Sequence, residues 1–270
     1  MPIDYTYLTA DIGASIKGSP ADLIRPDAAR EIRELLRERG VLVFKELNLT
    51  TDQQVELAGL LGTVREEGEG NIFKISIDPR INPGADYLKG SFLWHMDGTH
   101  DDVPVFASLL SGRKLSDVGG QTEFANSYAA YEALSPQMKE RIADLRVVHS
   151  FETSMNRADI EPTEAHVASW QSILTKVHKL VWTHEGGRKS LVIGCHASHV
   201  VDMDRQESDA LLTELMAWVT QPRFMYRHEW SVGDLLIWDN TGVLHRAEPY
   251  PIESGRMMDR TTLMGEEAFA

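Results

Sequence analysis

Cysteine, positive charge and long apolar runs are scarce in this sequence. The chain has one cysteine, and 41 aspartates and glutamates outnumber its 27 lysines and arginines, for a formal net charge of −14. One cysteine cannot form an internal disulfide, so a metal site has to use nitrogen and oxygen ligands. Proteins that bind nucleic acids or anionic membranes usually present a basic face. We therefore expect no nucleic-acid partner and no membrane partner.

Segments that would target or anchor the chain are also missing. Residues 1–18 lack the basic and apolar regions of a signal peptide, and the sequence has no run of about eighteen apolar residues. We expect a cytoplasmic protein. A length of 270 residues, with 42% hydrophobic and 25% charged composition, is enough for one domain with a sizeable core. Residues 1–270 are therefore expected to form a single domain.

Hydrophobic spacing predicts helices early in the chain and strands later. Amphipathic helices are predicted at 26–40 and at 51–61, where Thr51 and Gln54 have the spacing of a capping box. Shorter helices are predicted at 127–134, 135–143 and 208–219. Apolar or alternating runs predict strands at 41–44, 73–77, 91–96, 106–111, 122–125, 145–151, 180–184, 190–194, 224–230, 235–238, 243–246 and 257–263.

Many short strands with few helices between them predict a mostly β fold with peripheral helices. The expected architecture is a jelly roll, or double-stranded β-helix, with the N-terminal helices of residues 26–62 packed on its core. Residues 153–179 have the weakest pattern. A long loop in a compact domain is either a lid or a disordered segment, so these residues are a candidate lid.

The stretch FLWHMDGTHDDVP, residues 92–104, concentrates histidines and carboxylates. Side chains alternate between the two faces of a strand, so a strand here would place His95 and Asp97 on one face with Cα atoms about 6.6 Å apart. An imidazole and a carboxylate at that spacing can hold one metal ion. The alternative is a histidine with a structural hydrogen bond, followed by an ordinary Asp-Gly turn.

A third ligand has to come from elsewhere, and His245 is the candidate. It follows an apolar strand and precedes Arg256 by eleven residues. If Tyr250 and the next residue form the tip of a hairpin, antiparallel pairing places His245 opposite Arg256. Arg260 would share the face of Arg256, with the two arginines about 13 Å apart. The alternative is a pair of surface arginines on an edge strand.

Five residues occur in an order that resembles a known family. His95, Asp97, Thr122, His245 and Arg256 follow the pattern of the iron(II)/2-oxoglutarate-dependent dioxygenases of the taurine dioxygenase type. The similarity is strongest to the branch that cleaves phenoxyacetate herbicides such as 2,4-dichlorophenoxyacetate. It is carried by GGQTEFANSYAAYEAL at 119–134, GCHASHV at 194–200 and FMYRHEWSVGDLLIWDNTGVLHRAEPY at 224–250. One departure is Gln121, where relatives usually carry aspartate.

The resemblance implies a chemistry that the residue types also fit. Two imidazoles and one carboxylate on one face of a metal are typical of non-haem iron(II) centres and leave three positions open. The resemblance implies that 2-oxoglutarate and O₂ occupy these positions, and that Arg256 and Thr122 bind the far carboxylate of 2-oxoglutarate. It further implies that 2-oxoglutarate is decarboxylated to succinate and CO₂ while a substrate carbon is hydroxylated. If that carbon bears an ether oxygen, the product falls apart and the reaction becomes an ether cleavage.

Two further cations are candidates for binding the substrate. Arg260 lies beyond Arg256 on the same predicted strand face, and Lys74 lies in the stretch NIFKISID. In an acidic protein, two cations in a dry pocket make a selective anion site, so we expect a small anionic substrate, a carboxylate. The alternative for Lys74 is a solvated strand residue. His196 and His199 either line the pocket or make structural hydrogen bonds.

Other functions fit the same residues. An organosulfonate or sulfate-ester dioxygenase would use the same iron and co-substrate sites. A jelly-roll metal-binding or sensor protein would use the three metal ligands without turnover, but it would not need the carboxylate receptor formed by Arg256 and Thr122. Because relatives are commonly dimers or tetramers, we also expect a homo-oligomer.

Overall fold

A seven-stranded sheet forms the centre of the protein. The structure, a computed structural model, describes residues 2–82, 84–158 and 162–269. The strand order in this sheet is β1-β2-β3-β13-β5-β15-β4, and neighbouring strands are antiparallel except for β2 and β3. The strands are β1 (Asp4–Tyr7), β2 (Ala14–Lys17), β3 (Val41–Phe44), β13 (Leu235–Asp239), β5 (Ala107–Lys114), β15 (Met257–Leu263) and β4 (Phe73–Ile75).

Three smaller sheets accompany it. β6 (Thr122–Asn126) lies between β12 (Met225–His228) and β14 (Val243–Ala247), β7 (Arg146–His149) lies between β11 (Ala197–Val200) and β8 (Lys176–Lys179), and β9 (Val181–Thr183) pairs with β10 (Lys189–Leu191). Phe124 of β6 and Val243 of β14 share a buried cluster with Leu110, Leu236 and Met258 of the large sheet. The large sheet and the β12-β6-β14 sheet therefore pack against each other through a common core.

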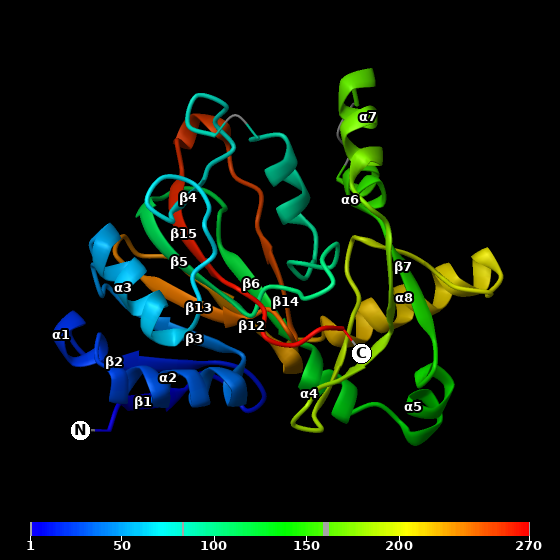
Figure 1. The fold of residues 1–270 in the computed structure, drawn as a ribbon, viewed down its shortest axis with the longest axis horizontal. Helices are drawn as coiled ribbons and strands as arrows, with labels where there is room; N and C mark the ends of the chain where they lie inside the picture. The colour runs from blue at the N-terminus through cyan, green and yellow to red at the C-terminus, as the bar shows by residue number, and fades with distance from the viewer. Residues whose placement is uncertain (1, 83, 159–161, 270) are drawn as a thin grey trace.

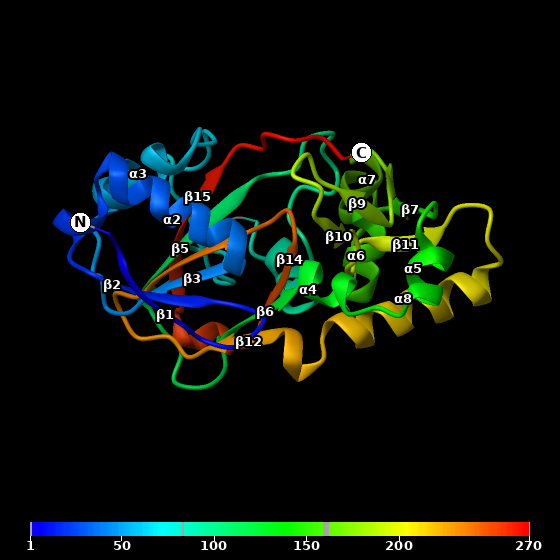
Figure 2. The same cartoon turned by 90° about the horizontal axis from the view of Figure 1, so that it is seen from below.

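Helices lie outside these sheets (Figures 1 and 2). α2 and α3 cover one end of the large sheet, and α8 and α5 lie at the opposite end of the molecule. No helix in the described ranges is long and apolar enough to span a bilayer. The helices and 3₁₀ turns are α1 (Pro20–Leu23), α2 (Pro26–Arg39), α3 (Thr51–Leu61), α4 (Ser127–Glu132), α5 (Pro136–Ile142), α6 (Phe151–Arg157), α7 (Glu164–Ser172), α8 (Arg205–Val219), η1 (Tyr87–Phe92), η2 (Pro222–Phe224) and η3 (Ile252–Ser254).

The two N-terminal helices confirm the sequence prediction almost residue by residue. α2 starts at Pro26, ends before Gly40 with a positive φ of 74°, and buries its apolar stripe against the large sheet. α3 starts at the predicted place, but its capping box joins Thr50 and Gln53, one residue earlier than predicted. Gln54 is instead fully buried and donates to the Asp259 carbonyl. A buried amide needs such a partner, which explains why it is unavailable for capping.

Two predicted segments have a different structure. Residues 91–96 do not form a strand; η1 occupies Tyr87–Phe92, and only His95 makes a β-bridge. Residues 153–179, predicted as an unpatterned loop, carry most of α6, all of α7 and the strand β8. Their periodicity is weak because α7 buries few side chains, among them Trp170. Residues 159–161 lie outside the described residues.

The predicted hairpin between β14 and β15 does not form. β14 pairs with β6, with His245 opposite Phe124, whereas β15 pairs with β5 and β4. The connection after Ala247 contains η3 and carries the chain from one sheet to the other, so His245 does not face Arg256 across a ladder. A strand in a sheet of three or more strands is more stable than a strand in an isolated two-stranded hairpin, which explains why β14 and β15 pair in separate sheets.

Asp234 is a buried carboxylate that ties the turn after β12 to the end of β3. It accepts hydrogen bonds from His228 Nε2 at 2.9 Å, from Lys45 Nζ at 2.5 Å and from the Glu46 N–H at 2.8 Å. Burial raises the pKa of Asp234, but the hydrogen bonds from His228 and Lys45 outweigh it and hold the pKa well below its usual range. His228 pairs with Thr122 of β6, so this cluster supports a strand that lines the site described below.

We expect Asp234→Asn to lower the free energy of unfolding by about 2–4 kcal/mol near neutral pH, because the donors around it lose a charged acceptor. The folded-state pKa lies below the unfolded value of about 4, so this stabilisation is present above pH of about 4 and is lost as the pH falls. Chemical denaturation of the wild type and of Asp234→Asn, from neutral pH to below pH of about 4, tests this expectation. A stability difference that stays constant below pH of about 4 would contradict the charged role of Asp234.

Candidate active site

The backbone holds His95 and His245 side by side. The His95 N–H donates to the His245 carbonyl at 3.1 Å, and the His245 N–H donates to the His95 carbonyl at 2.9 Å. Side chains directly opposite each other in an antiparallel pair leave on the same face. The ring centroids are accordingly 4.1 Å apart. One reciprocal pair of hydrogen bonds thus joins the segment after η1 to β14 and brings the two imidazoles together.

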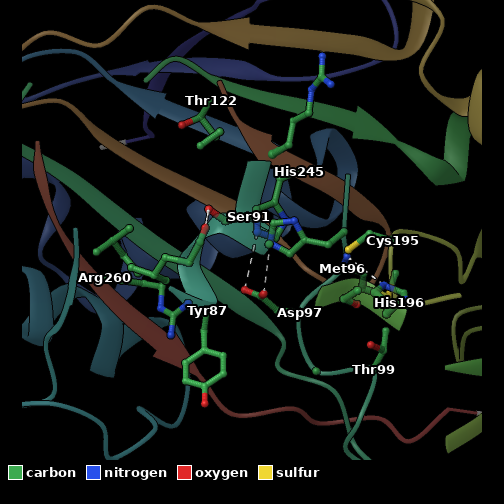
Figure 3. Close-up of a pocket in the computed structure, with 18 of the residues that line it drawn as sticks. Tyr87, Ser91, Met96, Asp97, Thr99, Thr122, Cys195, His196, His245 and Arg260 are labelled. Atoms are coloured by element: carbon green, nitrogen blue, oxygen red, sulfur yellow. Dashed lines mark hydrogen bonds and ion pairs between the residues drawn. The ribbon is translucent and has the colours of Figure 1, made fainter. Parts of the chain in front are cut away.

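Asp97 completes a group of three ligand atoms (Figure 3). Its Oδ1 lies 3.7 Å from His95 Nε2, and its Oδ2 lies 3.7 Å from His245 Nε2. The next residue, Gly98, has a φ of +84°, and a Cβ there would stand 2.8 Å from the Pro104 Cα, so the turn requires glycine. Within the described chain, one atom from each of the three side chains lies within 4.8 Å of the others. The structure therefore brings together the three residues predicted as metal ligands.

The protonation states suit a metal. His95 Nδ1 lies 2.8 Å from the Leu93 carbonyl, so Nδ1 donates to that carbonyl and Nε2 is the nitrogen on the side of Asp97. Burial lowers the pKa of His245 to about 3, and the field of His95 acts in the same direction, so the ring is neutral. Burial raises the pKa of Asp97, but His245 and His95 outweigh it and the carboxylate stays ionised. Two neutral imidazoles and a carboxylate are the donor set of non-haem iron(II) centres, so these residues fit iron(II).

A cavity of about 250 Å³ opens beside the three ligands. Figure 3 shows Tyr87, Thr122 and Arg260 around it together with Asp97 and His245. Apolar and aromatic side chains from the large sheet, η1 and α6 form much of its lining: Ile75, Leu110, Trp238, Tyr87, Phe151 and Met155. The cavity is therefore suited to a small molecule with an apolar body.

Arg256 is a buried cation in this lining. It is 2% exposed, donates from Nη2 to the Gly120 carbonyl at 2.9 Å, and lies 4.7 Å from the centroid of the Tyr250 ring. No carboxylate of the described residues forms an ion pair with it, and burial lowers its pKa. Thr122 also lines the cavity, and its hydroxyl accepts from Trp230 Nε1 at 3.0 Å. A buried arginine without a carboxylate partner can bind an anion.

Arg260 is a second cation in the lining. Its Nη2 lies 3.3 Å from Glu67 Oε2, and its guanidinium lies 5.0 Å from the centroid of the Phe73 ring. Its Nε is buried and has no hydrogen-bond partner among the described residues. Sequence reasoning predicted Arg260 but missed Glu67, which lies in the acidic stretch VREEGEG, where nothing distinguishes one glutamate from the next.

Lys74 lies away from the cavity. Its neighbour Ile75 belongs to the lining, whereas Lys74 points to the other face of β4 and its Nζ lies 2.5 Å from Asp259 Oδ1. This placement does not support the prediction that Lys74 binds the substrate. Gln121, the departure from the family pattern, does not belong to the cavity lining and donates from Nε2 to Glu229.

The two histidines of GCHASHV differ in their position relative to the cavity. His196 lines the cavity, but it is buried and engaged in structural hydrogen bonds, with Nε2 accepting from the Met96 N–H at 3.4 Å and Nδ1 lying 2.7 Å from His149 Nδ1. His199 does not belong to the lining and contacts the Ser198 hydroxyl. Trp182 and Trp238 are buried, and Trp238 also lines the cavity.

Comparisons with known proteins assign the family. A model described as "Taurine catabolism dioxygenase TauD, TfdA family" matches residues 4–262. The chain belongs to the TauD/TfdA family. It is 35% identical over 262 residues to the alpha-ketoglutarate-dependent 2,4-dichlorophenoxyacetate dioxygenase of Cupriavidus pinatubonensis, covering 88% of each chain. It is 30% identical over 282 residues to the (S)-phenoxypropionate/alpha-ketoglutarate-dioxygenase of Sphingobium herbicidovorans, covering 98% of this TauD/TfdA protein and 96% of that one.

Two further similarities bear on the site. An alkylsulfatase of Acinetobacter baylyi is 30% identical over 272 residues, covering 96% of this chain and 84% of its own. A solved structure described as AAD-2 in complex with Mn(II) and N-oxalylglycine superposes with a TM-score of 0.87 at 32% identity, covering 100% of both chains. The resemblance stated from the sequence is thereby confirmed.

This TauD/TfdA protein is a 2-oxoglutarate-dependent dioxygenase that uses iron(II) and O₂. Bound together, these cofactors supply the decarboxylation of 2-oxoglutarate to succinate and CO₂, coupled to hydroxylation of a substrate carbon. His95, Asp97 and His245 offer the donor set for the metal, and the adjacent cavity has room for a small molecule.

We expect Asp97→Ala and His245→Ala each to weaken Mn(II) binding by more than about a hundredfold, since loss of even an outer-shell partner of a metal ligand costs ten- to a hundredfold. Calorimetric titration of the apoprotein with Mn(II) measures the affinity without turnover. The matched control is Asp101→Ala, which removes an exposed carboxylate four residues along the same segment. A variant that binds Mn(II) like the wild type would remove that residue from the metal centre.

Proposed function

We propose that this dioxygenase oxidises a small carboxylate with an aromatic or other apolar body, of the aryloxyalkanoate class. The observation that carries the proposal is the pair of arginines in one cavity: Arg256 has no carboxylate partner among the described residues, and Arg260 has an unpartnered, buried Nε. Two anion receptors beside one metal centre fit one anionic co-substrate and one anionic substrate. The two herbicide dioxygenases among its relatives support the aryloxy carboxylate class.

Each receptor has a separate role in the proposal. Arg256 and the Thr122 hydroxyl bind the far carboxylate of 2-oxoglutarate, in a buried position where a charge-assisted hydrogen bond is strong. Arg260 binds the substrate carboxylate through its free Nε. His95, Asp97 and His245 would hold the metal in the same cavity. The apolar lining excludes water and leaves room for the substrate body.

The position of the attacked carbon follows from the carboxylate anchor. In an aryloxyacetate the carbon next to the carboxylate also bears the ether oxygen. Hydroxylation there gives a hemiacetal, in which the new hydroxyl closes to a carbonyl as the aryloxy oxygen leaves with the proton. The products are a phenol and glyoxylate, so the same reaction cleaves the ether.

A sulfonate or sulfate ester is the second candidate substrate class, because a guanidinium N–H also binds those oxyanions and because an alkylsulfatase is among the relatives. A metal store or sensor is disfavoured, since it has no use for an unpaired buried arginine such as Arg256.

Five further expectations accompany the proposal. The packing of the large sheet on the β12-β6-β14 sheet through one core supports a double-stranded β-helix, and the cavity lining by α6 supports a lid within residues 153–179. We propose that the chain is a single domain over 1–270, since the family model spans most of it. A cytoplasmic location and a homo-oligomeric state, dimer or tetramer, stay predictions from the sequence.

The substrate class can be tested by measuring succinate formation from 2-oxoglutarate with a panel of aryloxyacetates, aryloxypropionates, alkyl sulfates, sulfonates and amino acids. We expect succinate and phenol in equal amounts with an aryloxy carboxylate. Turnover restricted to sulfonates or sulfate esters would favour the second candidate, and turnover restricted to neutral or cationic compounds would contradict the anion site.

We expect Arg256→Ala to weaken 2-oxoglutarate binding by about thirty- to several thousand-fold, because losing a charge-assisted contact in a desolvated site costs about 2–5 kcal/mol. Anaerobic titration of the iron(II) protein, followed by the charge-transfer absorption of chelated 2-oxoglutarate, gives the affinity. Arg227→Ala is the control, since it removes an exposed arginine paired with Glu248. An unchanged 2-oxoglutarate affinity would assign Arg256 a purely structural role.

We expect Arg260→Ala to raise KM for the carboxylate substrate by about ten- to a hundredfold, the effect of losing a hydrogen bond to a charged group, and to leave 2-oxoglutarate affinity largely intact. Lys74→Ala should leave KM near the wild-type value, because Lys74 is paired with Asp259 on the other face of the sheet. Steady-state kinetics with the best substrate of the panel separates the two. A large KM effect of Lys74→Ala would restore Lys74 to the substrate site.

A further inference from the structure

Glu67 is held beside Arg260 by the way its loop runs along β15. The Arg65 N–H donates to the Thr262 carbonyl at 2.8 Å, and the Met264 N–H donates to the Thr63 carbonyl at 2.7 Å, so residues 63–65 continue the sheet as an extra edge. Gly68 then turns the chain with a φ of +63°, and a Cβ there would stand 1.9 Å from the Ile72 carbonyl oxygen. Glu67 is therefore fixed between this edge and a turn that only glycine can make.

The Glu67 carboxylate contacts two side chains on the cavity face of β15. Its Oε1 accepts from the Thr262 hydroxyl at 2.5 Å, and its Oε2 lies 3.3 Å from Arg260 Nη2. Thr262 and Arg260 are two residues apart on a strand, so they lie on the same face and one carboxylate can contact both. The side chains of Arg260 and Glu67 are 23% and 17% exposed, so water screens this pair only in part.

The contact with Glu67 leaves only part of the Arg260 guanidinium free to bind an anion. One edge of the guanidinium is occupied by Glu67, whereas Nε is buried, has no partner among the described residues, and belongs to a side chain that lines the cavity. An incoming anion therefore meets one arginine whose charge is already shared with the Glu67 carboxylate.

We propose that Glu67 makes the substrate site selective for singly charged anions. The proposal rests on the proposed function, in which Arg260 binds the substrate anion. A carboxylate or a sulfonate brings one negative charge, which the free Nε of Arg260 satisfies. A doubly ionised phosphonate of the same shape brings a second negative charge to an arginine that Glu67 already contacts, and like charges close together in a partly desolvated site repel strongly.

The experiment compares two ligands that differ in charge. The protein is loaded with Mn(II) and N-oxalylglycine, so that no turnover occurs, and the dissociation constants of phenoxyacetate and phenoxymethylphosphonate are measured by calorimetry at a pH where the phosphonate is doubly ionised. The wild type should bind phenoxyacetate at least about tenfold more tightly. Glu67→Gln should reduce this ratio by about tenfold, chiefly by improving phosphonate binding.

Two variants sharpen the comparison. Glu66→Gln removes the same charge from an exposed neighbouring position and should leave the ratio unchanged. Thr262→Val removes the hydroxyl that holds Glu67 and should reduce the ratio in the same direction but less, which keeps the test valid if Glu67→Gln does not fold.

The outcomes separate this inference from the proposed function. If Arg260→Ala weakens phenoxyacetate binding but neither Glu67→Gln nor Thr262→Val changes the ratio, the proposed function stands and the role of Glu67 is wrong. If Arg260→Ala leaves the binding of both ligands unchanged, the substrate anion does not bind at Arg260 and both proposals fall. A wild-type protein that binds the phosphonate as tightly as phenoxyacetate also contradicts the role of Glu67.

Discussion

The reciprocal pair of hydrogen bonds between the His95 and His245 backbones is the constraint on which the site depends. It attaches a segment with no other ladder to β14, and β14 is fixed in turn by its pairing with β6. Without this bridge, His95 and Asp97 would belong to an irregular stretch between η1 and β5. With it, two imidazoles and one carboxylate meet in a position that the core of two sheets keeps rigid.

Neighbouring residues of β15 place their charged side chains on opposite faces of the large sheet. Arg260 and Thr262 face the cavity side, where they meet Glu67. Asp259, the residue before Arg260, faces the other way and pairs with Lys74 and with Arg113, whose Nε lies 2.7 Å from Asp259 Oδ2. A slip of one residue in the β5-β15-β4 register would exchange the two sets, so the pairing of these strands fixes which charges the ligands meet.

The order of residue types along the chain predicted the candidate site residues. The alternation of side chains along predicted strands did not predict their arrangement in space. Residue types and their order, which the resemblance made specific, were enough to name the candidate metal ligands that the structure brings together, and Arg256 in the cavity lining. Their arrangement did not follow, because alternation along a short apolar run cannot distinguish a strand from a turn with one bridge, and residues 91–96 are the latter. The same limit applies to His245 and Arg256, since the choice of β14 and β15 to pair in different sheets depends on distant strands.

The local sequence also did not predict which face of the sheet a given side chain points to. Lys74 and Ile75 are adjacent, and only the pairing of β4 with β15 decides that Ile75 lines the cavity. Glu67 gave no signal because its role arises from a loop that contacts β15 almost two hundred residues later, as its hydrogen bond to Thr262 shows. By contrast, α2 and α3 followed from local capping and periodicity, which the sequence itself contains.

Two arginines have separate roles in the proposed site, one binding the co-substrate and one the substrate. The most direct test is a crystal structure of the protein with Mn(II), N-oxalylglycine and the aryloxy carboxylate that it turns over best. We expect the far carboxylate of N-oxalylglycine on Arg256 and Thr122 and the substrate carboxylate on Arg260 Nε, with the aromatic body against Tyr87 and Phe151. A substrate carboxylate bound elsewhere, with Arg260 contacting only Glu67, would contradict it.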